Sequence, residues 1–391
     1  MPSDQSTWLI AVPQDGDSEG MLQDVTTKFT QQSKSFPRNH ISQFAIPSFK
    51  TGTLASLISL SEDLIKQDTF FTNTVAKIVD TLRNLCNNDS SKLAQHILVN
   101  EQTVDDYLFG DWRWNEGRFG VQRGLREITD ILNKEISSID NVMKNKLNGY
   151  NQAKTHLTQL QRKKTGNLSV RSLADVVTKE HFIQDSEYLE TMVIAVPKNL
   201  VKEWNSKYER LTSMVVPRSA NAIASDDEYT LFTVVVFRRV RDEFVQKCRE
   251  NKYVVRDFQF SEDQLAKERE ELTTADSTEK ELWTELLRLS RINFSEAFQL
   301  LVHLKIVRLF IESVLRYGLP ANYTGLIIKP EPKSTKRTLQ LLQKHFSYLS
   351  PRSGHAKEKT SGNDDLAPEF QNLLEQEYYD FVLYEVPWIV N

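Results

Sequence analysis

Two long segments with narrow apolar seams constrain the fold of this chain more than any other feature. In the first, residues 121–164, apolar side chains recur at three–four spacing and continue after an eleven-residue step: Leu125, Ile128, Leu132, Ile139, Val142, Tyr150, Ala153, Leu157 and Leu160. The second begins after Ser261 and has heptad spacing at Leu265, Leu272, Ala275, Leu282, Leu286 and Leu289. Their charged flanks predict an antiparallel pair of exposed helices, and a helix of about 40 residues is about 60 Å long.

The sequence between these segments is richer in β-branched residues. It predicts four strands, at Met192–Val196, Met214–Val216, Tyr229–Phe237 and Tyr253–Phe260, and two helical stretches, at Leu200–Thr212 and Arg238–Asn251. The order β-α-β-β-α-β is typical of a small α/β domain on a ferredoxin-like plan. Residues 216–223 are expected to form a loop with Arg218 at its tip.

The outer parts of the chain also mix strands and helices. Strands are predicted at Thr7–Val12, Tyr323–Ile328 and Tyr379–Val386, and helices at Met21–Gln32, 53–85, Phe294–Tyr317 and Ser334–Leu349. TWLIAVP at the N-terminus echoes TMVIAVP at 191–197, which suggests that the first strand pairs with the C-terminal strands.

These patterns together predict a helix-rich α+β fold with the outline of an elongated dumbbell. Both termini would form a foot (1–120 and 292–391), two helices a long antiparallel coiled neck (121–165 and 261–291), and residues 166–260 an inserted small α/β head. The division follows from the nested order of the segments along the chain.

Charge and motif content exclude several function classes. Lys plus Arg number 49 against 53 for Asp plus Glu, a net charge of −4 that gives no global field for nucleic acid. Two cysteines, Cys86 and Cys248, cannot build a disulfide framework or a cysteine metal site, so a reducing compartment is expected. No phosphate-binding, dinucleotide, zinc-protease or nucleophile-elbow motif occurs. We therefore expect no catalytic, cofactor-binding or metal-binding residues, and interpret His303 as a satisfied core histidine.

Targeting signals are also not expected. The N-terminus has no basic stretch before an apolar run, and the longest uncharged apolar run, Leu231–Phe237, is far too short to span a bilayer. We expect a protein that does not cross a membrane.

Two groups of residues are candidates for partner binding. The basic cluster of Lys329, Lys333, Lys336, Arg337 and Lys344 could dock on an acidic partner or an anionic membrane face, although a plain solvated surface is an equal alternative. Trp112 and Trp114 lie in DYLFGDWRWNEGRFG, where aromatic residues alternate with charges and glycines. They are either interface anchors or side chains that fold back onto the foot.

Several long blocks resemble one family, the C-subunit of the eukaryotic V-type proton ATPase. These are residues 44–68, FAIPSFKTGTLASLISLSEDLIKQD; 171–198, RSLADVVTKEHFIQDSEYLETMVIAVPK; 214–223, MVVPRSANAI; 250–260, ENKYVVRDFQF; 292–320, INFSEAFQLLVHLKIVRLFIESVLRYGLP; and 375–386, EQEYYDFVLYEV. The resemblance runs nearly end to end and weakens at 87–120 and 350–370.

The resemblance implies a non-catalytic stator subunit of the cytosolic V1 sector, present in one copy per complex. In that family the head grips a peripheral stalk of the E and G subunits, and the foot meets a second stalk and the cytosolic N-terminal domain of the a-subunit. The family's protein resists rotor torque and takes part in reversible V1–Vo assembly, so it supports proton transport and organelle acidification from the cytoplasmic face, and it is free in the cytosol after disassembly.

On this basis we hypothesise that Arg218, Arg238, Arg239 and Arg241 help the head hold its stalk, and that the 329–344 face docks the foot. An alternative from a different class is an actin-binding scaffold, which the long helices also suit. Filament co-sedimentation against capture of E–G stalks separates the two.

Overall fold

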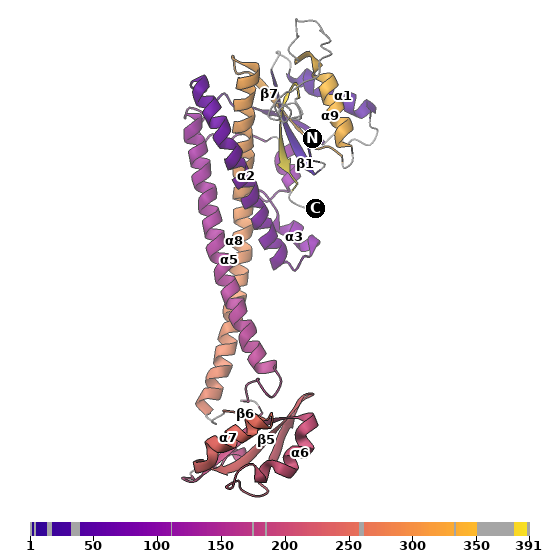
Figure 1. Ribbon diagram of the computed structural model, residues 1–391. Coiled ribbons are helices and arrows are strands. Elements are labelled where there is room, and N and C mark those ends of the chain that lie inside the picture. Colours follow the sequence, from indigo (N-terminus) through magenta and orange to yellow (C-terminus); the bar gives the residue numbers. More distant parts are fainter. Residues whose placement is uncertain are drawn as a thin grey trace, which may run out of the picture. The chain divides into compact units, whose positions relative to one another are not determined.

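The structure is a computed structural model that describes most of the chain. The described residues are 2–3, 5–13, 18–32, 40–110, 112–173, 176–183, 186–257, 262–331, 334–349 and 379–388, without the side chains of 18–19, 30–32 and 262–265. They fall into two compact units, unit 1 (Met1–Lys146 and Glu285–Asn391) and unit 2 (Leu147–Thr284). Two long helices, α5 (Leu125–Thr165) and α8 (Glu262–Tyr317), contribute to both units (Figure 1).

Unit 1 contains a four-stranded antiparallel sheet made from both ends of the chain. Its order is β2-β7-β1-β8, with β1 at Ser6–Pro13, β2 at Ile41–Ala45, β7 at Tyr323–Ile328 and β8 at Val382–Pro387. Trp8 of β1 lies opposite Ile328 of β7 on one side and Glu385 of β8 on the other. The expected pairing of the N-terminal strand with the C-terminal strands is therefore confirmed.

Helices complete the core of unit 1. They are α1 (Ser18–Gln32), α2 (Leu54–Leu85), α3 (Ser90–His96), α4 (Val104–Phe109), α9 (Thr335–His345) and the unit's parts of α5 and α8. Side chains of α1 and α9 pack with the sheet in one apolar cluster that includes Val25, Leu339 and Leu342. The part of α8 in this unit has buried apolar residues on almost every side of the helix, and Phe298, Leu304 and Phe310 are fully buried.

The long helices of unit 1 are linked by ion pairs as well as by apolar contacts. Asp68 of α2 accepts from Lys305 and Arg308 of α8, and Arg126 of α5 lies 2.8 Å from Asp63 of α2. Lys146 of α5 lies 2.6 Å from Glu285 of α8. The three helices therefore pack side by side in this unit.

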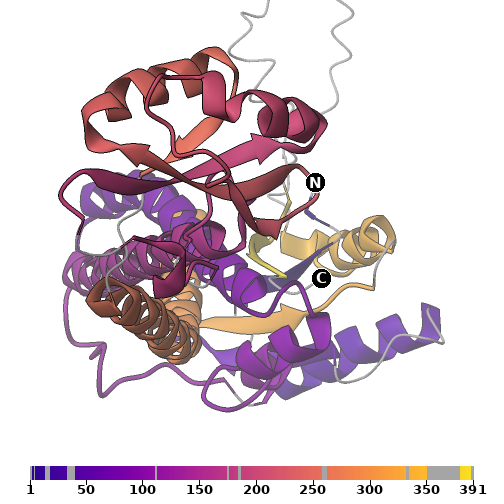
Figure 2. The same ribbon diagram turned by 90° about the horizontal axis from the view of Figure 1, so that it is seen from below.

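Unit 2 holds the second antiparallel sheet, with order β4-β5-β3-β6. Its elements run β3 (Leu189–Pro197), α6 (Val201–Lys207), β4 (Asn221–Ser225), β5 (Tyr229–Phe237), α7 (Arg241–Glu250) and β6 (Val254–Arg256). Both helices lie on one face of the sheet, over Ile194 and Val234 (Figure 2). The other face is packed by Leu168, Leu173 and Val177. The predicted β-α-β-β-α-β order is confirmed.

In unit 2 the two long helices pair antiparallel. Tyr150 faces Glu279, and His156 Nε2 lies 3.6 Å from Glu271 Oε1. Residue numbers therefore increase along α5 while those of the partner residues on α8 decrease, as in an antiparallel pair. Burial, with the hydrogen bond to Glu279, raises the pKa of the Tyr150 phenol to about 12.

Several details differ from the expectations: β2, α3 and α4 were not predicted, and β8 begins at Val382, three residues after the predicted start. Met214–Val216 is not a strand: Val215 alone bridges Val236, while β4 lies within the expected 216–223 loop and beyond it. The reason is local, since Pro217 lacks an N–H and Arg218 has a φ of 56°, so that strand geometry resumes only afterwards.

The second long helix and the predicted core helix are one element, α8, of 56 residues. The sequence from Glu262 to Tyr317 contains no proline or glycine to divide it. The predicted C-terminal end of β6 and the polar stretch from 350 lie outside the described residues. None of the described helices combines the length and the apolar character needed to cross a membrane.

Candidate partner-binding sites

The arginines predicted for the head are placed differently from one another. Arg238 and Arg239 form an exposed turn between β5 and α7, where no carboxylate of the described residues lies within ion-pair distance of them. Arg241 begins α7 and is half-buried, with its guanidinium 3.5 Å from Glu190 and 3.2 Å from Asp257. The charge of Arg241 is therefore neutralised within unit 2, whereas Arg238 and Arg239 remain available to a partner.

Arg218 occupies a loop that is held in one conformation. Its backbone N–H donates to Glu209 Oε1 at 2.8 Å, and Tyr208 donates to the same oxygen at 2.9 Å. Ser219 reinforces the loop by donating to Val216 O and accepting from Val235 N–H. The amide of Arg218 and the hydroxyl of Tyr208 lower the pKa of Glu209. The Arg218 side chain is thus exposed on a fixed backbone with a left-handed φ.

The predicted basic face of unit 1 is only partly exposed. Lys329, directly after β7, pairs with Asp105 and lies 5.1 Å from the ring centre of Trp388. Lys333 lies outside the described residues. Lys336, Arg337 and Lys344 are exposed on the side of α9 that faces away from its buried residues Thr338, Leu339 and Leu342.

Trp112 and Trp114 lie inside unit 1. Their exposed fractions are 4% and 8%, and their indole nitrogens donate to Tyr107 Oη and Phe119 O. Trp114 packs against Phe49 and His303, with ring centres 4.8 and 4.7 Å away. The structure thus favours the alternative in which this aromatic segment folds back onto its own unit, over the alternative of interface anchors.

His303 is the centre of that aromatic packing. Its Nδ1 lies 2.7 Å from Gln299 O, and its Nε2 accepts from Asn115 N–H at 3.3 Å, so both ring nitrogens are satisfied in the neutral form. Burial lowers the pKa of the imidazole to about 4. The interpretation as a satisfied core histidine is confirmed.

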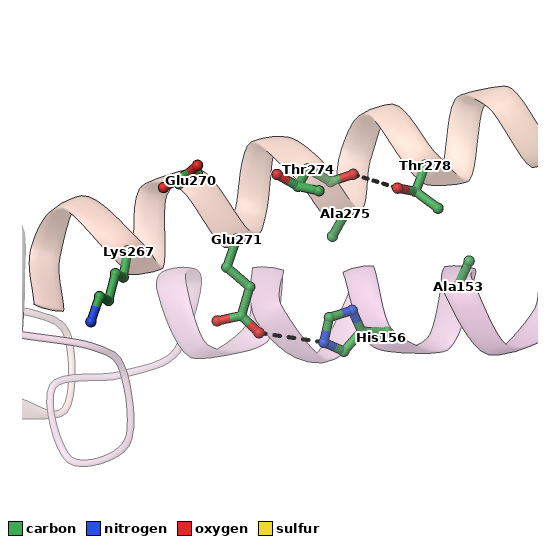
Figure 3. Close-up of a pocket in the computed structure, with 8 residues that line it drawn as sticks. All are labelled: Ala153, His156, Lys267, Glu270, Glu271, Thr274, Ala275 and Thr278. Carbon is green, nitrogen blue, oxygen red and sulfur yellow. Dashed lines mark hydrogen bonds and ion pairs between the residues drawn. The ribbon is translucent and has the colours of Figure 1, made fainter.

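Unit 2 also has a groove of about 460 Å³ between α5 and α8 (Figure 3). Small residues such as Ala153, Thr274 and Ala275 leave the helix pair open there, and the His156–Glu271 contact crosses it. Because its lining belongs to the seam of the helix pair, we assign the groove to incomplete coiled-coil packing and not to a chemical site.

Sequence reasoning from charge missed a set of exposed apolar side chains in unit 2. Phe237, Met214, Ile183 and Tyr188 are 39%, 41%, 43% and 72% exposed. A sequence signal existed for Phe237, since strict alternation along YTLFTVVVF places it on the opposite face from the buried Val236. The exposure of Phe237 also depends on how much of its own face is covered by other segments, and the alternation of residues along the strand does not predict that.

Comparison with known proteins extends over nearly the whole chain. The family model for the V-ATPase C-subunit matches residues 7–382. The V-type proton ATPase C-subunit 1-A of Danio rerio is 36% identical over 379 residues, 97% of each chain. The C-subunit of Manduca sexta is 37% identical over 379 residues, and C-subunit 1 of Mus musculus 35% over 382, again covering 97% of each chain.

One solved structure, the cytoplasmic N-terminal domain of the V-ATPase I-subunit, a homolog of the a-subunit, aligns with a TM-score of 0.33 and 12% identity. It covers 87% of this chain and 97% of that one, and at this score the likeness carries no argument. The relatives matched by sequence, in contrast, are similar enough to assign the family. With a family model matched over residues 7–382 and identities above 30% over 97% of each chain, the chain belongs to the C-subunit family of the V-type proton ATPases.

Proposed function

We propose that this chain is a non-catalytic stator subunit of the V1 sector of a V-type proton ATPase. It joins peripheral stalks of the E and G subunits to the N-terminal domain of the a-subunit and resists the torque of the rotor. In this role it supports ATP-driven proton transport, and its release accompanies reversible separation of V1 from Vo. Its place is peripheral, on the cytosolic side of the membrane.

The observation that carries this proposal is the family match over 97% of both chains, which includes both units and both long helices. If the match covered one unit only, it would support attachment to one partner but not to a second partner through the other unit. We further propose that unit 1 serves as the foot, the sheet domain of unit 2 as the head, and the paired helices as the neck of a dumbbell.

The mechanics of a rotary enzyme explain why two attachments in one chain are needed. ATP hydrolysis turns the rotor only if the catalytic part is held against the reaction torque. Several modest interfaces on one chain act together through effective concentration, so they hold firmly yet release as a set when one weakens. This behaviour suits an assembly that must separate on demand.

Calorimetric titration of the full chain with a recombinant E–G heterodimer tests the proposal. Reversal of both free arginines, Arg238→Glu with Arg239→Glu, is expected to weaken binding by about tenfold, or 1.4 kcal/mol. Lys202→Glu, an exposed charge on α6 of the same unit, serves as the matched control and should change the affinity less than about twofold.

Absence of binding by the unmodified chain, in both calorimetry and co-elution, would refute the stator proposal. Co-sedimentation with actin filaments in that case would favour the scaffold alternative.

A further inference from the structure

Two helices of unit 1 meet at a contact between a lysine and a histidine. Nζ of Lys28, on α1, lies 2.7 Å from Nδ1 of His345, the last residue of α9. Lys28 is exposed and His345 is half-buried. The two helices lie side by side (Figure 1), and both contribute to the apolar cluster that packs with the sheet. The contact is therefore a polar link between two helices that also share part of the core.

This contact requires a neutral imidazole. An ammonium group can only donate hydrogen bonds, so Nδ1 of His345 must accept, and the imidazole proton must then be on Nε2. A protonated imidazole has a proton on both nitrogens and cannot accept. Two positive charges would also face each other at this short distance. Binding of a proton to His345 therefore turns an attractive contact into a repulsive one.

The charged groups around His345 do not all act in the same direction. Among the described residues, Lys28 of α1 disfavours a positive imidazole, whereas Asp24, one turn earlier on α1, favours it. On α9 itself, Lys344 is exposed and adjacent in sequence, while the C-terminal end of a helix favours positive charge. The ring of Phe346, 4.8 Å away, brings no charge. Burial and Lys28 outweigh the groups that favour protonation, because the pKa of His345 is lowered.

Helix α1 supplies both a part of the core and the charge that opposes protonation. Val25 and Phe29, one turn apart on α1, are buried, and Phe29 directly follows Lys28. Single helices can open locally in a folded protein without global unfolding. When α1 opens, His345 loses the contact with Lys28, so its pKa should return toward the ordinary value. Proton binding and opening of α1 therefore favour each other.

We propose that Lys28 and His345 form a proton-sensitive latch, which holds α1 on α9 while the imidazole is neutral and loosens α1 when the imidazole is protonated. The open state binds more protons than the closed one, so opening becomes easier as pH falls. An ordinary histidine titrates near 6.5, which limits the rise in the opening equilibrium to about tenfold between pH 7.5 and pH 5.5. The latch belongs to unit 1 alone and does not depend on the stator function.

Hydrogen exchange of the α1 amides in the full chain tests the latch. It is measured by mass spectrometry at pH 7.5 and pH 5.5, with correction for the intrinsic exchange rate at each pH. The opening equilibrium of α1 is expected to rise by about twofold to tenfold on acidification. His345→Gln keeps an acceptor for Lys28 but cannot gain a proton, so the rise should disappear. His156→Gln, the same substitution in unit 2, is the matched control and should leave the rise unchanged.

Variants of Lys28 separate the effect of charge from that of packing. Lys28→Arg keeps a positive donor and should preserve the pH dependence. Lys28→Met removes the opposing charge, so it should reduce the dependence and raise the pKa of His345. That pKa is read directly by NMR titration of the full chain with labelled histidine, which also provides a test if His345→Gln does not fold.

Two results would overturn the proposal. One is an equal pH dependence of α1 opening in the unmodified chain and in His345→Gln, which would assign the dependence to other groups. The other is a titration in which Lys28→Met leaves the pKa of His345 unchanged, which would show that the two side chains are not coupled.

Discussion

The neutral state of His303 makes unit 1 sensitive to acid. Its pKa is lowered to about 4 by burial, while an unfolded histidine titrates near 6.5. Between these values the unfolded chain binds more protons than the folded one, so the free energy of unfolding falls as pH falls. From pH 7 to pH 5 the loss attributable to this residue is about 2 kcal/mol.

Urea unfolding at both pH values, followed by tryptophan fluorescence, measures this loss. His303→Gln should be less stable at pH 7 but should lose less stability between pH 7 and pH 5. The pKa of His40 and that of His345 are also lowered by burial, so some dependence remains in the variant. An identical dependence in both proteins would contradict the account of His303.

The first turn of α9 carries charge of the wrong sign for its helix. Lys336 and Arg337 are exposed there, and the turn contains no acidic residue, although the N-terminus of a helix favours negative charge. Lys336→Glu should therefore raise the stability of the isolated chain by about 0.3–1 kcal/mol. Chemical denaturation measures the change, with Lys344→Glu in the last turn as a control expected to act in the opposite direction.

At the scale of elements, the β2–β7 pair depends on one glycine. The ring of Phe44 on β2 lies directly over Gly325 on β7, and a Cβ on that residue would come within 2.4 Å of the ring. Gly325→Ala should destabilise unit 1 by about 1–3 kcal/mol, because Phe44 is buried and has little room to move.

A double-mutant cycle checks this contact. In a Phe44→Leu background the Gly325→Ala substitution should cost clearly less, because the smaller side chain leaves space for the methyl group. Equal costs in the two backgrounds would show that the ring is not what excludes a side chain at this position.

The sequence predicted those elements whose own residues determine them. β5 and β7 have the predicted bounds because YTLFTVVVF and YTGLII are strongly β-forming. By contrast, β4 has the sequence NAIAS, which has a weak preference for strands. It forms a strand because it pairs with β5. The charges show the same limit: Arg241 acquires partners in Glu190 and Asp257, which only the folded sheet brings to it.

At the scale of the whole molecule, the chain builds two sheet-containing units and passes between them through α5 and α8. Each unit has its own core, so each can carry its own interface without rearrangement of the other. This organisation suits the proposed stator with two attachments. The boundaries of foot, neck and head remain a prediction.

The most direct test is whether the chain holds both proposed partners at once. The N-terminal domain of the a-subunit is immobilised, and soluble E–G heterodimer is added with and without the full chain. The account predicts that E–G is retained only when the chain is present, and that reversal of Arg238 and Arg239 lowers retention while the chain itself stays bound. Retention of the chain without E–G, or competition between the two partners for it, would contradict the stator function.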